Sequence, residues 1–153
     1  MILKNTDRVR GAALHFLEFG YYTQSLPGTK DYYDFWDEEK NKCLYGYKID
    51  EGTDTELHVT GFHYFYLNYC PIDRAVDEVM PDGSTQARRE RTFPAFYDGD
   101  YEYFHEIDIA RKKNKHMIVL KARRKGYSYK AGSMLARNYF FVKNSKNFVF
   151  AGQ

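Results

Sequence analysis

The spacing of apolar residues in the first half of the chain changes between helical and strand periods. Residues 4–19 and 31–43 carry apolar side chains three and four positions apart, which predicts two helices, with Asp31 as the N-cap of the second. Residues 43–50 and 55–60 alternate apolar and polar side chains around the turn-rich sequence EGTD, which predicts a β-hairpin. A second hairpin is predicted within residues 71–93, with its turn at Pro81-Asp82-Gly83.

The sequence FHYFYLNY at residues 62–69 is rich in aromatic rings at helical spacing. Rings three and four positions apart stand on Phe62, Phe65, Tyr66 and Tyr69. This spacing predicts a helix whose aromatic face is buried in the core. The alternative is that the same rings stack against the bases of a nucleic acid. We expect the core, because aromatic residues at helical spacing usually reflect packing.

From residue 96 onward the pattern is helix, strand, loop, helix and strand. Residues 98–115 have helical spacing, 115–122 form a short apolar run, and 127–142 are again helical, with Met134, Leu135 and Tyr139 predicted to face inward. Residues 148–153 begin a second strand. A strand–helix–strand unit predicts a parallel sheet. The predicted fold class is therefore α/β, with an α+β accessory region containing hairpins at 1–95 and the start of a parallel sheet at 96–153.

Charge is distributed unevenly along a chain whose net charge is only +2. All 21 acidic residues lie at or before Asp108, whereas 12 of the 23 lysines and arginines lie after it. The basic end predicts a polyanionic partner, either nucleotide phosphates or nucleic acid. The alternative is that the acidic part of the chain folds against the basic part. No apolar run reaches 18 residues, so neither a membrane span nor a membrane partner is predicted.

The segment KARRKGYS at residues 121–128 has the outline of a phosphate-binding loop. Such a loop follows a buried strand, turns at a glycine and opens a helix whose N-terminal N–H groups face the anion. The usual spacing is GxxxxGK[ST]. Gly126 and Ser128 fit it, while Lys121 replaces the first glycine and Tyr127 replaces the usual lysine. A lysine at the strand end has the reach to contact the phosphates, and Arg124 can grip phosphate oxygens with two hydrogen bonds.

This loop, with lysine first and arginine before Gly-x-Ser, resembles the deviant Walker A loop of some terminase large subunits, the DNA-packaging ATPases of tailed bacteriophages. The segment VTGFHYFYLNYCPI at 59–72 resembles a segment found upstream of the motor in a subset of those sequences. The segment FPAFYDGDYEYFHEIDIA at 93–110 lies where the family has its adenine-recognising segment. The resemblance covers roughly residues 30–153, and it implies the start of a P-loop ATPase sheet of the ASCE type.

The resemblance implies that ATP and Mg²⁺ bind at the loop. Lys121 and Arg124 would contact the β- and γ-phosphates. Backbone N–H groups would come from Gly126, Tyr127 and Ser128, and the Ser128 hydroxyl would help to hold Mg²⁺. Together these residues would form the phosphate side of a nucleotide site.

Two other parts of the family's nucleotide site, the adenine-binding segment and the catalytic acids, match this sequence less completely. Residues from Phe96 to Tyr101 would lie near the adenine, and the glutamine usual in that segment has no counterpart there. Hydrolysis also needs an apolar strand ending in Asp-Glu, whose acids support Mg²⁺ and orient the attacking water. No carboxylate follows Lys121. We therefore expect an N-terminal fragment of a larger motor, with no catalytic residue of its own and no useful ATPase activity alone.

The resemblance also implies partners and a setting. The partners would be double-stranded DNA, the terminase small subunit, the portal protein and the remaining part of the large subunit, in the cytoplasm of an infected bacterial host. Two alternatives stay open. One is a non-enzymatic nucleic-acid-binding module that uses the basic C-terminal third. The other is a structural or interaction protein that kept the fold of the motor without its chemistry.

Overall fold

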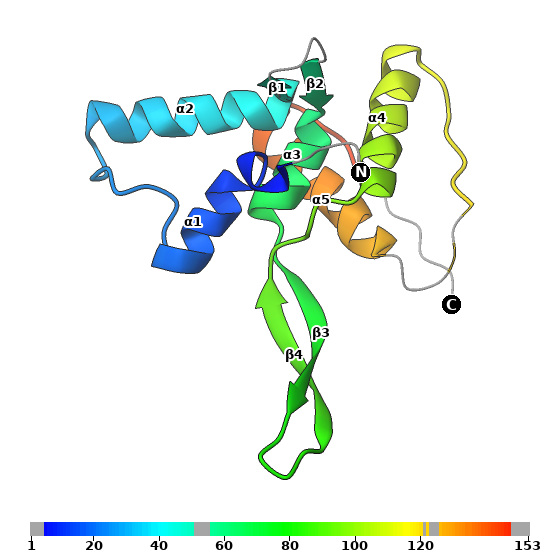
Figure 1. The fold of residues 1–153 in the computed structure, drawn as a ribbon. Coiled ribbons are helices and arrows are strands. Elements are labelled where there is room, and N and C mark those ends of the chain that lie inside the picture. The colour runs from blue at the N-terminus through cyan, green and yellow to red at the C-terminus, as the bar shows by residue number, and fades with distance from the viewer. Residues whose placement is uncertain (1–4, 51–55, 121, 123–125, 148–153) are drawn as a thin grey trace.

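Helix α3 (Gly61–Tyr69) lies at the centre of the protein, and the other helices pack around it (Figure 1). The computed structural model describes residues 5–50, 56–120, 122 and 126–147. The other elements are η1 (Thr6–Arg8), α1 (Gly11–Phe19), α2 (Lys30–Tyr45), β1 (Tyr47–Asp50), β2 (Glu56–Val59), β3 (Ile72–Val79), β4 (Thr85–Thr92), α4 (Asp98–Lys112) and α5 (Tyr127–Phe141). The expected mixture of helices and strands is confirmed, as are both hairpins, which form two separate antiparallel sheets.

The N-cap residue of α2 is not the one that was predicted. Thr29, in extended backbone conformation, is the N-cap, and its side chain accepts a hydrogen bond from the backbone N–H of Tyr32. Asp31, predicted as the cap, lies instead in the first turn of α2. A carboxylate in the first turn still stabilises the helix, because it faces the positive end of the helix dipole.

Two glycines allow α2, the first hairpin and α3 to meet closely. Gly46 ends α2 with φ 93° and ψ 178°, a conformation that is essentially restricted to glycine. A Cβ atom on Gly61 would lie 2.4 Å from the carbonyl oxygen of Cys43. Thr60 caps α3, with its hydroxyl accepting from the N–H of His63 at 3.3 Å. The Thr60-Gly61 pair therefore starts α3 directly against the end of α2.

The predicted core position of the aromatic helix is confirmed. Every residue from Gly61 to Asn68 is buried. Phe65 packs in one apolar cluster with residues of α2 and the first hairpin, whereas Phe62 and Tyr66 pack in another with Phe104 of α4. Because this helix is enclosed on all sides, its rings are core residues rather than a base-stacking surface.

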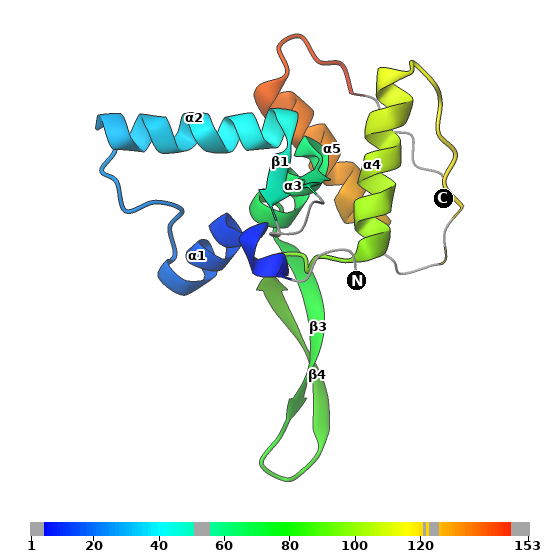
Figure 2. The same cartoon turned by 45° about the horizontal axis from the view of Figure 1, so that its top comes forward.

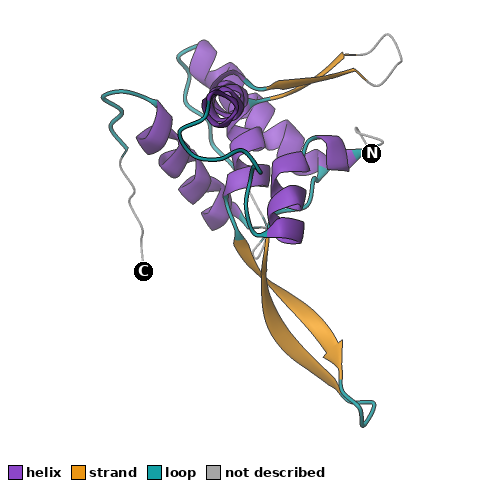
Figure 3. Ribbon diagram, turned by 90° about the vertical axis from the view of Figure 1, so that its left-hand side faces the viewer, coloured by secondary structure: helices purple, strands orange, loops and turns teal. Residues whose placement is uncertain are grey.

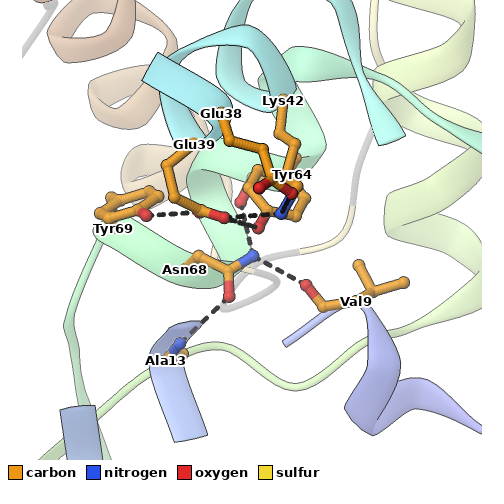
Figure 4. A network of polar contacts seen from close by, with 8 residues as sticks. All are labelled: Val9, Ala13, Glu38, Glu39, Lys42, Tyr64, Asn68 and Tyr69. Atoms are coloured by element: carbon orange, nitrogen blue, oxygen red, sulfur yellow. Dashed lines mark hydrogen bonds and ion pairs between the residues drawn. The ribbon is translucent and has the colours of Figure 1, made fainter. Parts of the chain in front are cut away.

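Buried polar groups fix the position of α3 between α1 and α2 (Figure 4). Asn68 donates to the carbonyl of Val9 at 2.8 Å and accepts from the N–H of Ala13 at 3.1 Å. The carboxylate of Glu39, from α2, accepts hydrogen bonds from the hydroxyls of Tyr64 at 2.8 Å and Tyr69 at 2.5 Å. Burial and the nearby Glu39 charge raise the pKa of both tyrosines, so both remain proton donors.

The β3–β4 hairpin projects away from the helices (Figures 1 and 3). Its register places Asp73 opposite Arg91 and Arg74 opposite Glu90. Cross-strand pairs of opposite charge stabilise such a ribbon. Most of its side chains are exposed, so the hairpin has no apolar face of its own.

The C-terminal third departs from the predicted parallel unit (Figure 2). Helices α4 and α5 are confirmed, but residues 115–120 between them belong to no strand. Strands are held by hydrogen bonds to a neighbouring strand, and no described residue pairs with this run. Ile118 and Leu120 are accordingly 89% and 95% exposed. The second predicted strand, at 148–153, lies outside the described residues, so a parallel sheet is not shown.

The inward face of α5 also differs from the prediction. Tyr139, expected to face inward, is 79% exposed, and Met134 is only partly buried. The buried positions are Lys130, Ser133 and Arg137. Polar residues therefore occupy the face that packs on the helices α2, α3 and α4.

Candidate functional site

The start of α5 has the backbone geometry of an anion-binding helix terminus. Gly126, directly before the helix, has φ 70° and ψ 12°, a left-handed conformation that favours glycine. No side chain caps this end, and the first turn contains no acidic residue. The first backbone N–H groups of a helix have no acceptor within the helix, so they carry a partial positive charge. Ser128 is exposed in this turn.

A buried ion pair holds this turn in place. The ammonium of Lys130 pairs with the carboxylate of Asp100 in the first turn of α4, with side chains only 4% and 13% exposed. Lys130 Nζ also lies 4.3 Å from the centre of the Tyr127 ring, which contacts the Tyr103 ring edge-on at 4.9 Å. The start of α5 is therefore fixed against the start of α4.

The predicted adenine-side residues lie in the same region, packed around a buried histidine. The ring of His63 is stacked between Phe96 and Phe104, at centroid distances of 5.1 Å and 5.0 Å. Tyr101 lies 6.1 Å from Phe96 and is half-buried. Phe96 is only 7% exposed and serves the core in this structure, so its contact with an adenine stays a prediction.

His63 has an unusual environment for a titratable group. It is fully buried, and neither ring nitrogen has a hydrogen-bond partner among the described residues. Burial, together with the charge of Lys130, lowers its pKa from the usual 6.5 to about 3. The imidazole is therefore neutral in the folded protein at any pH near neutrality.

This depressed pKa predicts a loss of stability in mild acid. Below its unfolded pKa of 6.5, His63 binds a proton in the unfolded chain but not in the folded one, until the pH approaches about 3. Between about pH 7.5 and about pH 5, the free energy of unfolding should fall by about 2 kcal/mol on account of His63. Urea unfolding at a series of pH values measures this slope.

His63→Phe should remove that contribution while keeping a flat ring between Phe96 and Phe104. His58, whose pKa is also lowered by burial and nearby cations, remains in both chains, so the difference between them isolates His63. His116→Gln, at an exposed position, serves as the control and should follow the wild-type curve. Identical pH slopes for wild type and His63→Phe would contradict the assignment.

Toward the other end of α5, the side chain of Arg137 caps the C-terminal end of α2, a role that was not predicted from the sequence. Arg137 is 2% exposed and donates from Nε to the carbonyl of Cys43 at 2.9 Å and from an Nη to that of Leu44 at 2.8 Å. The carbonyl of Lys42 accepts from the N–H of Gly46. The last four carbonyls of a helix have no partner within it, and Arg137 supplies two of the missing partners for α2.

The predicted phosphate contacts divide into described and undescribed residues. Gly126, Tyr127 and Ser128 lie together at the start of α5. Lys121 and Arg124 lie outside the described residues, so their roles stay predictions. Sequence reasoning missed Lys130 and Arg137, although their spacing with Ser133, at i, i+3 and i+7, marks one helix face.

Comparisons with known proteins do not identify a relative: no protein-family model, curated protein or solved structure matches this chain. Within the described part of the chain, no helix is both long and apolar enough to cross a membrane. The same residues contain no group of three or more His, Cys, Asp or Glu side chains placed to hold a metal ion. Any role for the start of α5 must therefore be argued from its own chemistry.

Proposed function

We propose that this chain is the ATP-binding, N-terminal part of a DNA-packaging motor of the terminase large-subunit type. The observation that carries the proposal is the left-handed Gly126 directly before α5, with Ser128 exposed in the first turn. This geometry matches the two positions of KARRKGYS that retain the usual phosphate-loop residues. In the complete motor the site would power DNA translocation into a procapsid.

The residues at this turn fit a bound nucleotide phosphate. The uncapped N-terminus of a 15-residue helix directs backbone dipoles toward an anion, and no acidic side chain in the first turn opposes it. Ser128 would hold Mg²⁺ through its hydroxyl, and the metal would neutralise phosphate charge. Lys121 and Arg124 would supply the cations that the usual lysine provides in related loops.

Two further features support the proposal. The Lys130–Asp100 pair joins the proposed phosphate side to the segment 96–101, where the base is expected, so both halves belong to one packed unit. The apolar run at 117–120 is exposed, although four successive apolar residues are typical of a buried strand. A core strand would have exposed apolar side chains of this kind if its neighbours in the sheet lay outside the described residues.

Nucleotide binding by variants of the loop tests the proposal. Replacing Lys121 with alanine should weaken binding of a fluorescent, non-hydrolysable ATP analogue in the presence of Mg²⁺ by about tenfold or more, because a charge-assisted contact to phosphate is lost. A fluorescence titration of the purified chain measures the dissociation constant. Lys143→Ala removes an exposed cation beyond the far end of α5 and should leave the affinity unchanged.

Equal affinity of wild type and Lys121→Ala would reject the role given to Lys121. Equal losses in Lys121→Ala and Lys143→Ala would instead indicate binding through general positive charge. Matched unfolding curves of the two variants and the wild type should confirm that any loss is local.

A second candidate function is nucleic-acid binding without nucleotide chemistry. It is favoured by the end of α4, where residues 111–116 are all exposed and four of them are lysine or arginine. Such a surface binds phosphate backbones without sequence preference, and its affinity falls steeply with salt. Duplex DNA binding with a steep salt slope and no response to ATP would support this second function over the first.

A further inference from the structure

A small cavity lies where the end of α2 meets the start of α3. Its volume is about 160 Å³, and its walls come from α2, β2, α3, α4 and α5. The charged groups that line it are His58, Asp108, Arg111, Lys112 and Arg137. Basic residues from β2, α4 and α5 therefore line one space that is open to solvent, since the side chains of Arg111 and Lys112 are 55% and 68% exposed.

The positive charge around this cavity exceeds the negative charge. Among the described residues that line it, Asp108 is the only acidic one, and it is already paired with Lys112 at 2.6 Å. The guanidinium groups of Arg111 and Arg137 lie 5.2 Å and 4.5 Å from the centre of the same Phe62 ring. Two like charges held against one ring repel each other, and the carboxylate of Asp108, 4.0 Å from Arg111 and 2.6 Å from Lys112, is already shared between two of the three cations.

The pKa values of two groups that line the cavity are lowered, which agrees with the excess of positive charge. Burial and the charge of Arg111 lower the pKa of Arg137, and burial with nearby cations lowers that of His58. The residues that line the cavity also come from different elements. Arg111 and Lys112 come from α4, whereas Thr60, Gly61 and Phe62 form the start of α3. Arginine, lysine and the backbone N–H groups at the start of a helix are all groups that bind phosphate in proteins.

We propose that this cavity binds a phosphate group, held mainly by Arg111 and Lys112 above the Phe62 ring. Arginine grips phosphate with paired hydrogen bonds, and lysine contributes a mobile point charge. Arg137 stays committed to the carbonyls of α2, so it contributes charge rather than direct contact. His58 Nε2 lies 3.2 Å from the carbonyl oxygen of Tyr45, and a carbonyl only accepts, so this nitrogen carries the proton.

This site is separate from the proposed nucleotide site. Gly126 and Arg137 are eleven residues apart on α5, which corresponds to about 16 Å along the helix axis. The proposal rests on described side chains alone and does not depend on residues 121–125. The phosphate group can belong to free phosphate or to a nucleic acid, and the experiment separates these sources.

The test follows the imidazole NMR signals of His58 during titration with inorganic phosphate at constant ionic strength. In the wild type these signals should shift and saturate, since a bound anion changes the field at the ring. In Arg111→Gln/Lys112→Gln, apparent affinity should fall by about tenfold or more. Asp108→Asn removes the only lining carboxylate and should tighten binding, a gain that damage to the fold does not produce.

Controls assign the response to the cavity. Lys143→Gln and Lys121→Ala should both keep the full His58 response. Among nucleic acids, a response to a 5′-phosphorylated oligonucleotide but not to its 5′-hydroxyl form would identify a terminal phosphate, whereas a response to both would identify the backbone. A response to inorganic phosphate alone would identify the free ion.

Two results would overturn the proposal. One is the absence of any His58 response up to about 10 mM phosphate. The other is a response that survives in Arg111→Gln/Lys112→Gln but disappears in Lys121→Ala, which would place the phosphate at the start of α5. In the second case the nucleotide proposal would stand and the cavity proposal would fall, so the two failures are distinguishable.

Discussion

Replacing Arg137 with methionine is expected to lower the free energy of unfolding by about 3–5 kcal/mol. Methionine keeps most of the volume of the side chain but donates no hydrogen bond. The carbonyls of Cys43 and Leu44 would lose their partners at 2.9 Å and 2.8 Å. Buried acceptors without partners cost their full desolvation energy, and α5 would lose its polar contact with the end of α2.

Urea unfolding followed by circular dichroism measures this loss as a lower midpoint with an unchanged slope. Arg137→Lys is the informative comparison, because it keeps the charge near the end of α2 but cannot reproduce the fork of donors, so it should recover only part of the loss. Arg88→Met is the matched control, since the Arg88 side chain is 66% exposed and lies 3.7 Å from Glu78. A cost below about 1 kcal/mol for Arg137→Met would show that the α2 carbonyls find other partners.

Arg137 also illustrates why part of the fold could not be predicted from sequence. Apolar spacing and turn residues are local signals, and they predicted the five α-helices and the two hairpins that the described residues form. The same reasoning placed Tyr139 inside, because it counted apolar residues as the buried face. The face of α5 that is buried in the structure is set by carbonyl acceptors on α2, which lie more than ninety residues away in sequence. The local spacing of apolar residues contains no information about such distant acceptors.

The structure explains several residues of the segment at 59–72, which resembles a segment of terminase large subunits. Thr60 caps α3, Gly61 allows contact with Cys43, and Tyr64, Tyr69 and Asn68 complete the polar contacts with α1 and α2. In this structure these residues hold the helices together. The sequence alone showed only that the segment was helical and aromatic, because hydrogen bonds to distant elements leave no periodic pattern.

The predicted parallel sheet is not shown among the described residues, and the physical reason is a different one. A parallel strand exists only with neighbours on its edge, whereas a hairpin brings its own partner within a few residues. Both hairpins therefore form among the described residues, and the apolar run at 117–120 remains unpaired. The start of α5 could be predicted, since Gly126 before a helical pattern is a local signal. The pairing of Lys130 with Asp100 could not be predicted, because it joins two different helices.

Breaking the Lys130–Asp100 pair should have an effect as large as the loss of Arg137. Lys130→Met leaves a carboxylate in a site that is 13% exposed, and Asp100→Asn leaves an ammonium that is 4% exposed. Removing one partner of a buried ion pair typically costs about 3–5 kcal/mol, because the remaining charge has no compensation. The Tyr127 and Tyr103 rings, whose centres lie 4.3 Å and 5.6 Å from Lys130 Nζ, attract the ammonium that remains in Asp100→Asn but do not replace the lost carboxylate.

The double variant Asp100→Asn/Lys130→Met is the decisive measurement. With both charges gone, no uncompensated ion remains, so the double variant should be clearly more stable than the sum of the two single losses predicts. Urea unfolding of the four chains gives the coupling energy, which we expect to be about 2 kcal/mol or more. Lys30→Met, which breaks an exposed pair with Asp34, is the control and should leave the urea midpoint essentially unchanged, because water screens that pair. Additive losses in the Lys130 cycle would mean that the two charges act independently, and the start of α5 would then be held by its aromatic contacts rather than by the ion pair.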